Sequence, residues 1–358
     1  MDILKILEDK IALVIPAYEP DERLDSLLEE IRKDYTGPII LVNDGSAKEY
    51  DGFYEAGEKQ GCVLLKHYRN MGKGRALKTA FNYCLNTYPN LIGCVTADSD
   101  GQHKPEDIYR CMKALSEKPN ALILGCRNFD MEDVPFKSKF GNKLTHKVCK
   151  WLCGVDVSDT QTGLRGIPKE LMAKLLNTPG ERFEFETRML LETRDYCDIE
   201  EIEIETVYDS KENHQTHFDP FKDSLRIYKI FGEVFIKFLF SSLSSSVIDL
   251  VLFVLLCPIL KPLSAVYYVT AATVIARVIS ATYNYLINYK FVFTSKANHG
   301  HSASRYFLLA LVQMSASALL VTVGVFLLPI LPEGVIKVIV DTILFFISFR
   351  IQRALVFA

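Results

Sequence analysis

Val95-Thr96-Ala97-Asp98-Ser99-Asp100-Gly101-Gln102-His103 continues an apolar run, residues 91–95, and decides the fold of the first half of the chain. The run has the length of a strand and no polar alternation, which is typical of a strand buried on both faces. Side chains two apart in an extended segment point the same way, so Asp98, Asp100 and Gln102 can converge on one point. Hard oxygen ligands in this arrangement suit Mg²⁺ or Mn²⁺ held against a diphosphate. The alternative is a polar turn in which Asp and Gly supply only turn chemistry and a cap.

Charge is distributed unevenly along the 358 residues. Residues 1–236 hold 32 of the basic and 41 of the acidic side chains, and residues 237–358 hold 9 and 3. An acidic, water-soluble domain is therefore followed by a hydrophobic, basic one. The nine cysteines lack the paired spacing of a zinc or redox motif, and the first ten residues lack the apolar stretch of a signal peptide. We expect the soluble domain to face the cytosol with its thiols reduced.

Apolar runs of strand length alternate with helical patterns in the first half of the chain. The runs are residues 11–15, 39–42, 63–65, 91–95 and 121–125. Their alternation with helices predicts an α/β domain, a mostly parallel sheet with helices on both faces. Ligands of such sheets bind beyond the carboxyl ends of the strands. Four side chains follow these strands in sequence and are predicted to gather at one edge of the sheet: Tyr18, Asp44, Lys73 and Asp98.

Two glycines flank a lysine at the predicted helix start Gly72-Lys73-Gly74. Bare backbone there lets N–H groups approach an anion, to which Lys73 or Arg75 adds a positive charge. The spacing is not that of a P-loop. A plain helix entry is the other interpretation.

In order along residues 10–230, these stretches resemble the family-two inverting glycosyltransferases of GT-A fold, specifically the polyprenyl- and dolichyl-phosphate sugar synthases. The motifs that carry the resemblance are Ile15-Pro16-Ala17-Tyr18-Glu19, Val42-Asn43-Asp44-Gly45-Ser46, Asn70-Met71-Gly72-Lys73-Gly74, Ala97-Asp98-Ser99-Asp100-Gly101-Gln102-His103, Gly125-Cys126-Arg127 and Asp159-Thr160-Gln161-Thr162-Gly163-Leu164-Arg165. The resemblance implies a Rossmann-like GT-A domain over residues 1–220.

The resemblance also implies a nucleotide-diphosphate sugar as the donor. The expected donor-binding residues are Pro16, Ala17, Tyr18, Glu19, Asp44, Lys73 and Asp98, with the diphosphate near Lys73. Mg²⁺ or Mn²⁺ would bind Asp98, Asp100 and Gln102. An Asx turn is the alternative role for Asp44, and a place in the core is the alternative for Tyr18.

The implied acceptor is a polyprenyl phosphate. Candidates for binding its phosphate are Arg127, Lys137, Lys139 and Asn142. Relatives have an arginine where this chain has several lysines, and lysine cannot make the bidentate fork, so Arg127 is the preferred single residue. The expected catalytic residues are Asp100, Arg127 and Asp159; Asp159 would position the acceptor, act as a base, or only form a turn.

The sequence of the second half of the chain predicts association with a membrane. Residues 221–236 predict a basic amphipathic helix that lies in the headgroup region. Residues 237–358, broken at prolines 258–262 and 329–332, predict an all-α transmembrane domain with four spans of about twenty residues. Basic residues in the middle connector and at the end place both termini in the cytosol by the positive-inside rule.

An internal repeat runs through this domain. Residues 285–293 (Tyr-Leu-Ile-Asn-Tyr-Lys-Phe-Val-Phe) are echoed by residues 349–357 (Phe-Arg-Ile-Gln-Arg-Ala-Leu-Val-Phe). The region resembles the small GtrA-like four-helix membrane domains. Arg277 is expected to face the bundle interior and to join the two hairpins by pairing with Asp249 or Asp341, because a charge within a span is costly.

Together these features predict an enzyme that transfers one sugar, with inversion, to undecaprenyl or dolichyl phosphate at the cytosolic face of the plasma membrane. The Gln-x-x-Arg-Trp signature of processive synthases is missing, since Val148-Cys149-Lys150 precedes the single tryptophan. A lipid-linked sugar flippase and a glycosyltransferase to a hydroxyl are the alternatives. We expect no nucleic-acid partner; a homo-oligomer is left open.

Overall fold

The computed structural model describes residues 7–128, 136–194, 196–205, 222–262, 266–293, 295, 297–328 and 330–357. The chain forms two compact units, Met1–Ile230 and Phe231–Ala358. Each is described by itself.

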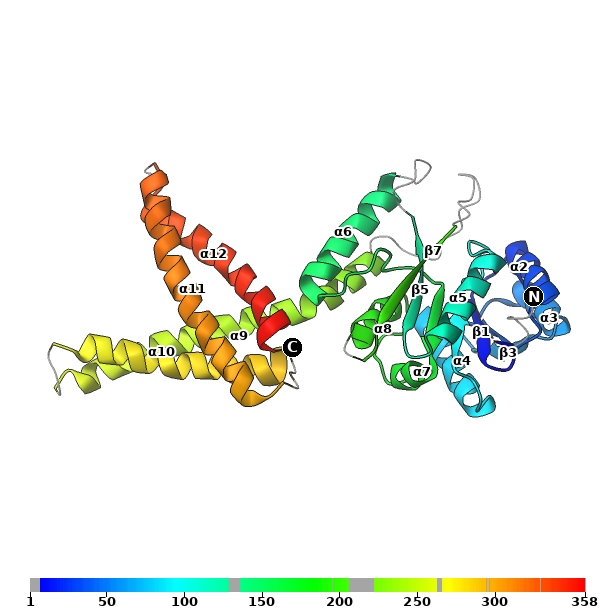
Figure 1. Ribbon diagram of the computed structural model, residues 1–358, viewed down its shortest axis with the longest axis horizontal. Coiled ribbons are helices and arrows are strands. Elements are labelled where there is room, and N and C mark those ends of the chain that lie inside the picture. Colours follow the sequence, from blue (N-terminus) through cyan, green and yellow to red (C-terminus); the bar gives the residue numbers. More distant parts are fainter. Residues whose placement is uncertain are drawn as a thin grey trace. The chain divides into compact units, whose positions relative to one another are not determined.

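The first unit is built on one sheet (Figure 1). Its strands lie in the order β3-β2-β1-β4-β6-β5-β7. The strands are β1 (Ile11–Ala17), β2 (Ile39–Asn43), β3 (Val63–Lys66), β4 (Gly93–Thr96), β5 (Leu122–Arg127), β6 (Arg165–Pro168) and β7 (Ile199–Ile204). The pairs β1–β2, β1–β4, β2–β3 and β5–β7 are parallel, whereas β6 is antiparallel to both β4 and β5. The predicted mostly parallel sheet is confirmed, with a reversed strand that the apolar runs did not indicate.

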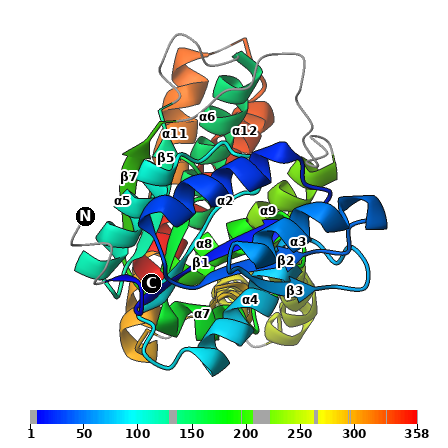
Figure 2. The same ribbon diagram turned by 90° about the vertical axis from the view of Figure 1, so that its right-hand side faces the viewer.

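Helices cover both faces of this sheet (Figure 2). They are α2 (Glu22–Asp34), α3 (Asp51–Lys59), α4 (Lys73–Thr87), α5 (Pro105–Glu117), α6 (Phe136–Cys153), α7 (Lys169–Leu175) and α8 (Glu184–Arg194), with a short 3₁₀ turn at Lys48–Tyr50. Ile11, Leu13 and Ile15 of β1 lie in one core cluster with the apolar faces of α2 and α5. The intervening residues of β1 point to the opposite face, since side chains alternate along a strand, and α4 packs there.

The parallel strands bring distant segments to one edge of the sheet. Ala17 at the end of β1 pairs with Asn43 at the end of β2, and Val14 of β1 pairs with Thr96 at the end of β4. The loops that begin at residues 18, 44 and 97 therefore leave the sheet side by side. The predicted gathering of polar residues at this edge is confirmed for these three loops.

The second unit contains four long helices among the described residues of this part of the chain. They are α9 (Lys222–Leu260), α10 (Tyr268–Ile287), α11 (His299–Leu327) and α12 (Glu333–Ile351). In α9 and α11, the segments Tyr228–Leu260 and His299–Leu327 are long and apolar enough to cross a membrane, and their apolar windows are not buried in the unit. The helix count matches the prediction, while four membrane spans remain an expectation.

Helix α9 continues through residue 237, where we expected the interfacial helix to end and the transmembrane domain to begin, and is a single helix of 39 residues. Its charged beginning and its apolar remainder both favour helix, and no proline interrupts it near residue 237. An interfacial position of residues 221–236 stays an expectation.

The two halves of the predicted repeat end in the same way. A π-helical turn, η2 (Asn288–Val292), follows α10, and another, η3 (Gln352–Val356), follows α12. In each turn the side chain at the first position is buried, and Asn288 Nδ2 donates to Gln352 Oε1 at 3.0 Å. Asn288 also donates to Asn284, which accepts from Tyr306 of α11. A buried polar chain therefore links both repeats and gives the Asn288 NH₂ group its partners, whereas Asn288 Oδ1 is buried without one.

The charged residues within the helices pair inside each hairpin rather than between hairpins. Arg277 Nη2 lies 3.1 Å from Asp249 Oδ2, and Asp249 also accepts from Ser280 of α10. Asp341 accepts from Ser317 of α11 and pairs with Lys337 of its own helix. The pairing of Arg277 with Asp249 is confirmed. Its predicted interior position is wrong, because the Arg277 side chain is 70% exposed, and the pair joins α9 to α10 only.

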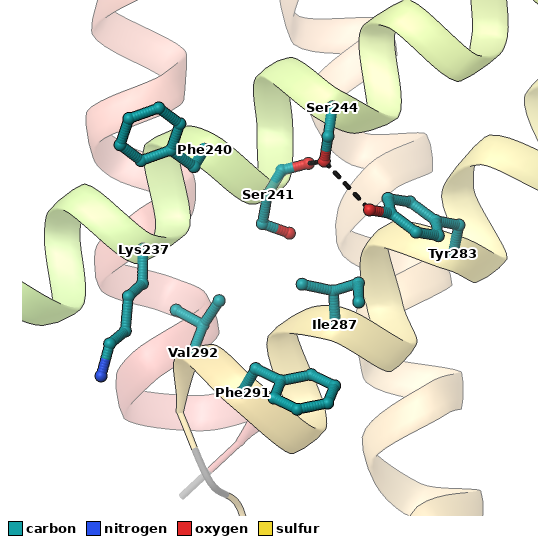
Figure 3. A pocket seen from close by; sticks show the side chains of 8 residues that line it. All are labelled: Lys237, Phe240, Ser241, Ser244, Tyr283, Ile287, Phe291 and Val292. Carbon is teal, nitrogen blue, oxygen red and sulfur yellow. Dashed lines mark hydrogen bonds between the residues drawn. The ribbon is translucent and has the colours of Figure 1, made fainter.

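A groove of about 560 Å³ lies between α9 and the end of α10 (Figure 3). It is lined by Lys237, Phe240, Ser241, Ser244, Tyr283, Ile287, Phe291 and Val292. The hydroxyls of Ser244 and Tyr283 are 3.3 Å apart across it. The groove is thus mainly apolar, with hydroxyls on its wall and one lysine among its lining residues.

Arg277→Leu should lower the stability of the detergent-solubilised protein by about 1 kcal/mol, the usual size of a polar contact between membrane helices. The reason is that Asp249 would lose its cationic partner and keep only Ser280. Thermal unfolding followed by circular dichroism measures the loss. Adding Asp249→Leu should restore part of it; if the two losses simply add, the residues do not stabilise each other.

Candidate active site

Asp98 and Asp100 lie directly beyond β4, where the sequence predicts them. The loop turns back on itself at Gly101, whose φ of +72° favours glycine. The Asp98 N–H donates to His103 Nδ1 at 3.2 Å, and the Gln102 N–H donates to Asp100 Oδ1 at 3.1 Å. The predicted ligand loop is therefore folded as a closed turn.

The pKa values of the two carboxyls in this loop are shifted in opposite directions. Burial raises the pKa of Asp98, but the charges of Lys73 and His103 outweigh it and hold the pKa well below its usual range. Burial and the negative charge of Asp98 raise the pKa of Asp100. Burial lowers the pKa of His103, against the opposing effect of the Asp98 and Asp100 charges. The loop thus holds two mutually repelling carboxyls, of which Asp98 stays ionised.

Lys73 is the cation of this site. Its Nζ lies 2.6 Å from Asp98 Oδ1 and 2.9 Å from Glu186 Oε1 of α8. Burial lowers its pKa, but Asp98 and Glu186 together raise the pKa above its usual value. Lys73 is therefore a buried, permanently charged ammonium held between two carboxylates.

The glycines beside Lys73 serve close packing. A Cβ on Gly72 would lie 2.4 Å from the Glu181 carbonyl oxygen, and one on Gly74 would lie 2.5 Å from Phe185 Cβ. The N–H of Gly72 donates to Asp44 Oδ2 at 2.7 Å. The N–H groups just before α4 thus contact a carboxylate of the chain itself, and binding of a ligand anion at this helix start stays a prediction.

Asp44 is accordingly an interior residue. Its carboxylate also accepts from the Met71 N–H at 2.9 Å and lies 2.7 Å from His67 Nδ1. Only 3% of the residue is exposed. Asp44 thus joins the end of β2 to the loop before α4, and its predicted contact with the donor nucleoside stays a prediction.

The remaining donor-binding candidates lie at the end of β1. Pro16 and Ala17 are buried strand residues, so they offer a ligand little beyond backbone. Tyr18 is half-buried, and its hydrogen bond with Glu19, followed by burial, raises the pKa of its hydroxyl. Glu19 has a positive φ of 49°, and its N–H donates to Ser46 Oγ. Tyr18 and Glu19 are the two candidates here with accessible side chains.

Arg127 and Asp159 form a two-point ion pair. Arg127 Nε donates to Asp159 Oδ2 at 2.6 Å, and Arg127 Nη2 donates to Oδ1 at 3.1 Å. Asp159 is completely buried and also accepts from the Gln161 N–H, whereas a quarter of the Arg127 side chain is exposed. Of the roles considered for Asp159, this geometry favours positioning. A carboxylate with both oxygens engaged is poorly placed to take a proton.

Two of the acceptor-phosphate candidates, Lys137 and Lys139, have side chains outside the described residues. Asn142 of α6 donates to the Ser158 carbonyl at 2.7 Å, so it lies one residue away from Asp159. The structure therefore places Asn142 next to the segment that carries Asp159, and its role at the acceptor phosphate stays a prediction.

Three residues to which the sequence analysis assigned no role in the site lie beside it. Glu186 anchors Lys73, and a Cβ on Gly163 would lie 2.2 Å from Asp98 Oδ2. Arg165 is almost fully buried and donates to the Thr162 and Glu186 carbonyls. A lone acid on the apolar face of α8 was the available signal for Glu186.

The donor set fits a divalent cation that is shared with phosphate. Asp98 and Asp100 offer adjacent carboxylates whose repulsion a cation relieves, and the Asp98 carboxylate occupies the space that a Gly163 side chain would need. Among the described residues no three His, Cys, Asp or Glu side chains cluster to enclose a metal. Magnesium commonly binds through one or two carboxylates and completes its shell with substrate phosphates and water. These residues fit Mg²⁺ or Mn²⁺ held together with a diphosphate.

Comparisons with known proteins identify both halves of the chain. Residues 12–176 match the family described as glycosyl transferase family 2, and residues 237–357 match the GtrA/DPMS transmembrane domain. The UDP-N-acetylglucosamine–dolichyl-phosphate N-acetylglucosaminyltransferase of Methanococcus voltae is 25% identical over 218 residues, 55% of this chain and 86% of that protein. The dolichyl-phosphate β-glucosyltransferase of Dictyostelium discoideum is 26% identical over 243 residues, 61% of this chain and 72% of that protein.

Among solved structures, glucosyl-3-phosphoglycerate synthase of Mycobacterium tuberculosis, in complex with Mn²⁺, UDP-glucose and phosphoglyceric acid, aligns with a TM-score of 0.48. It is 14% identical in sequence, and the alignment covers 64% of this chain and 80% of that chain. The match to glycosyl transferase family 2 agrees with the Rossmann-like GT-A sheet of the first unit, and the match to the GtrA/DPMS transmembrane domain agrees with the helical second unit. The chain is a glycosyltransferase in which a family 2 domain of GT-A fold is followed by a GtrA/DPMS transmembrane domain.

Proposed function

We propose that this glycosyltransferase moves a single sugar, with inversion, from a nucleotide-diphosphate sugar to a polyprenyl phosphate. The observation that carries the proposal is the pairing of two sites at one sheet edge. Asp98, Asp100 and Lys73 suit a diphosphate, and the Arg127–Asp159 pair presents a held guanidinium nearby, whose charge acts on the Asp98 carboxyl. Both relatives named above act on dolichyl phosphate by name, which supports a lipid phosphate as the acceptor.

In the proposed reaction an oxygen of the acceptor phosphate forms the bond to the anomeric carbon of the sugar. The bond from that carbon to the donor diphosphate breaks, and the nucleoside diphosphate leaves with the electron pair. The acceptor is already an anion near neutral pH, so it needs little activation by a base. This agrees with the burial of Asp159 in its ion pair.

In this proposal the basic residues bind the phosphates of the two substrates, and the acidic residues bind the metal ion. Lys73 would stabilise the departing diphosphate, and Arg127, oriented by Asp159, would hold the acceptor phosphate by charge-assisted hydrogen bonds. Asp98 and Asp100, with Gln102, would hold Mg²⁺ or Mn²⁺. When bound, that cation neutralises charge on the leaving group. Tyr18, Glu19 and the edge formed with Asp44 would contact the nucleoside.

We also propose that the second domain crosses the membrane four times. Among the residues that the structure describes, two helices are long and apolar enough to span a bilayer, and the repeat pairs each of them with a shorter helix. With both termini and the active site on the cytosolic side, the acceptor phosphate at the membrane surface would meet the catalytic domain. The plasma membrane is the expected location.

The test is transfer by the purified full chain in detergent. A panel of labelled nucleotide sugars is offered with a short polyprenyl phosphate and, as the matched control, with the same polyprenol lacking phosphate. We expect label in a polyprenyl monophosphate sugar from one donor and none in the polyprenol. Equal labelling of the polyprenol would favour a hydroxyl acceptor, and no transfer from any donor would contradict the proposal.

A further inference from the structure

Lys73 places a positive charge on the carboxylate that the proposed metal needs. The ammonium lies 2.6 Å from Asp98 Oδ1, and its side chain is only 15% exposed. The Asp98 side chain is 30% exposed, so the attraction is strong mainly because the ammonium itself is close and largely shielded from water. A divalent ion arriving at Asp98 must therefore compete with an internal ammonium.

Glu186 gives that ammonium a second position. Its Oε1 lies 2.9 Å from Lys73 Nζ, and its side chain is 8% exposed. Lys73 can thus lose contact with Asp98 and still face a buried carboxylate. Without Glu186, a bound divalent ion would leave Lys73 buried beside another cation with no anion to neutralise it, which is costly.

The backbone keeps Lys73 and Glu186 together. Gly72 and Gly74 lie against residues 181–185 so closely that a Cβ on either would clash. The Arg75 N–H donates to the Glu181 carbonyl at 3.0 Å, which fastens the same two segments. Asp98, in contrast, comes from the separate loop after β4. The Lys73–Glu186 pair therefore belongs to one packed unit, and the contact to Asp98 crosses to another element.

We propose that Lys73 neutralises Asp98 in the metal-free protein and is taken over by Glu186 when a divalent cation binds Asp98. Lys73 is then an internal competitor of the metal, and Glu186 is a positioning residue that acts through Lys73. The inference rests on the proposed metal-dependent function and adds a role for Glu186 that this function does not require.

The test is Mn²⁺ affinity of the full chain in detergent without nucleotide, read from the paramagnetic resonance signal of free Mn²⁺. Lys73→Gln should tighten Mn²⁺ binding about tenfold, since the competing charge is gone. Lys73→Arg should leave the affinity near that of the wild type. Lys78→Gln is the matched control: it removes another buried lysine of α4, which pairs with Glu181, and should change the affinity less than about twofold.

Glu186→Gln should weaken Mn²⁺ binding about fivefold, because Lys73 would then depend on Asp98 alone. In the Lys73→Gln background the same change should have almost no effect, since the residue acts through Lys73. An equal loss in both backgrounds would mean a direct effect of the Glu186 charge and would overturn its positioning role. Thermal unfolding of each variant verifies that it is folded.

The outcomes separate this inference from the proposed function. If Asp98→Asn abolishes Mn²⁺ binding but Lys73→Gln leaves the affinity unchanged, Lys73 does not compete and the inference fails while the metal site stands. If neither the wild type nor Lys73→Gln binds Mn²⁺, the metal assignment itself fails, and the inference fails with it. Tightening in Lys73→Gln together with non-additivity at Glu186 supports the inference.

Discussion

Asp98→Asn and Asp100→Asn should each slow sugar transfer by at least about a thousandfold while the protein stays folded. The proposed cation would lose one of two carboxylates, and the leaving diphosphate would lose the charge that stabilises it. The measurement is single-turnover transfer of labelled sugar at saturating donor. An excess of chelator should reduce the wild-type rate to a similar level.

Glu106→Gln is the control for this prediction, because Glu106 is an exposed carboxylate near the same loop. It should transfer sugar at nearly the wild-type rate. Full activity of the wild type in excess chelator would contradict the metal assignment. Activity of Asp100→Asn near the wild-type rate would contradict the role of that carboxylate.

Arg127→Ala should raise the KM for the lipid phosphate about tenfold to a hundredfold and change the KM for the nucleotide sugar much less. A charge-assisted hydrogen bond to the acceptor would be lost, while Asp98 and Lys73 would remain. Initial rates over a matrix of both substrate concentrations give the two constants. Asp159→Asn should act in the same direction but less strongly, because it releases the guanidinium without removing it.

Lys118→Ala serves as the matched control for Arg127→Ala. Lys118 is an exposed cation just before β5, the strand that ends at Arg127, and it pairs with Glu200. It should leave both constants unchanged. Equal damage to both substrates in Arg127→Ala, or damage to donor binding alone, would argue against an acceptor-phosphate role.

Local pattern predicted much of the first domain. The apolar runs ended within two residues of the ends of β1, β2 and β4, so the loops carrying Tyr18, Asp44 and Asp98 were placed at the correct edge. The reversed strand β6 escaped notice, because antiparallel pairing between two parallel strands is a long-range choice that no four-residue stretch displays. The order of the strands was likewise beyond local periodicity.

The site shows the same limit. The carboxylates of residues 98 and 100 stand out because they are close in sequence and follow a strand. Glu186 is 113 residues from Lys73, and only the fold brings the two within 2.9 Å. The contact of Asp44 with the Gly72 N–H was not predicted for the same reason: this donor lies 28 residues further along the chain.

In the second domain the repeat was visible in the sequence, but its π turns were not. A π turn has a hydrogen bond between residues five apart, such as the Phe293 N–H to the Asn288 carbonyl, and leaves no apolar period of its own. The pairing of Arg277 within one hairpin instead of between two depends on helix rotation. Sequence spacing alone does not determine that rotation.

The close contact of Gly72 and Gly74 with residues 181–185 has a consequence for protein engineering. Segments 70–75 and 180–186 act as one exchangeable cassette, although more than a hundred residues separate them. A chimera that takes only one of these segments from a relative would pack it against a segment it does not fit, next to Lys73. Swapping both segments together keeps this packing intact, so libraries that aim to change donor preference at this edge should vary them as a linked pair.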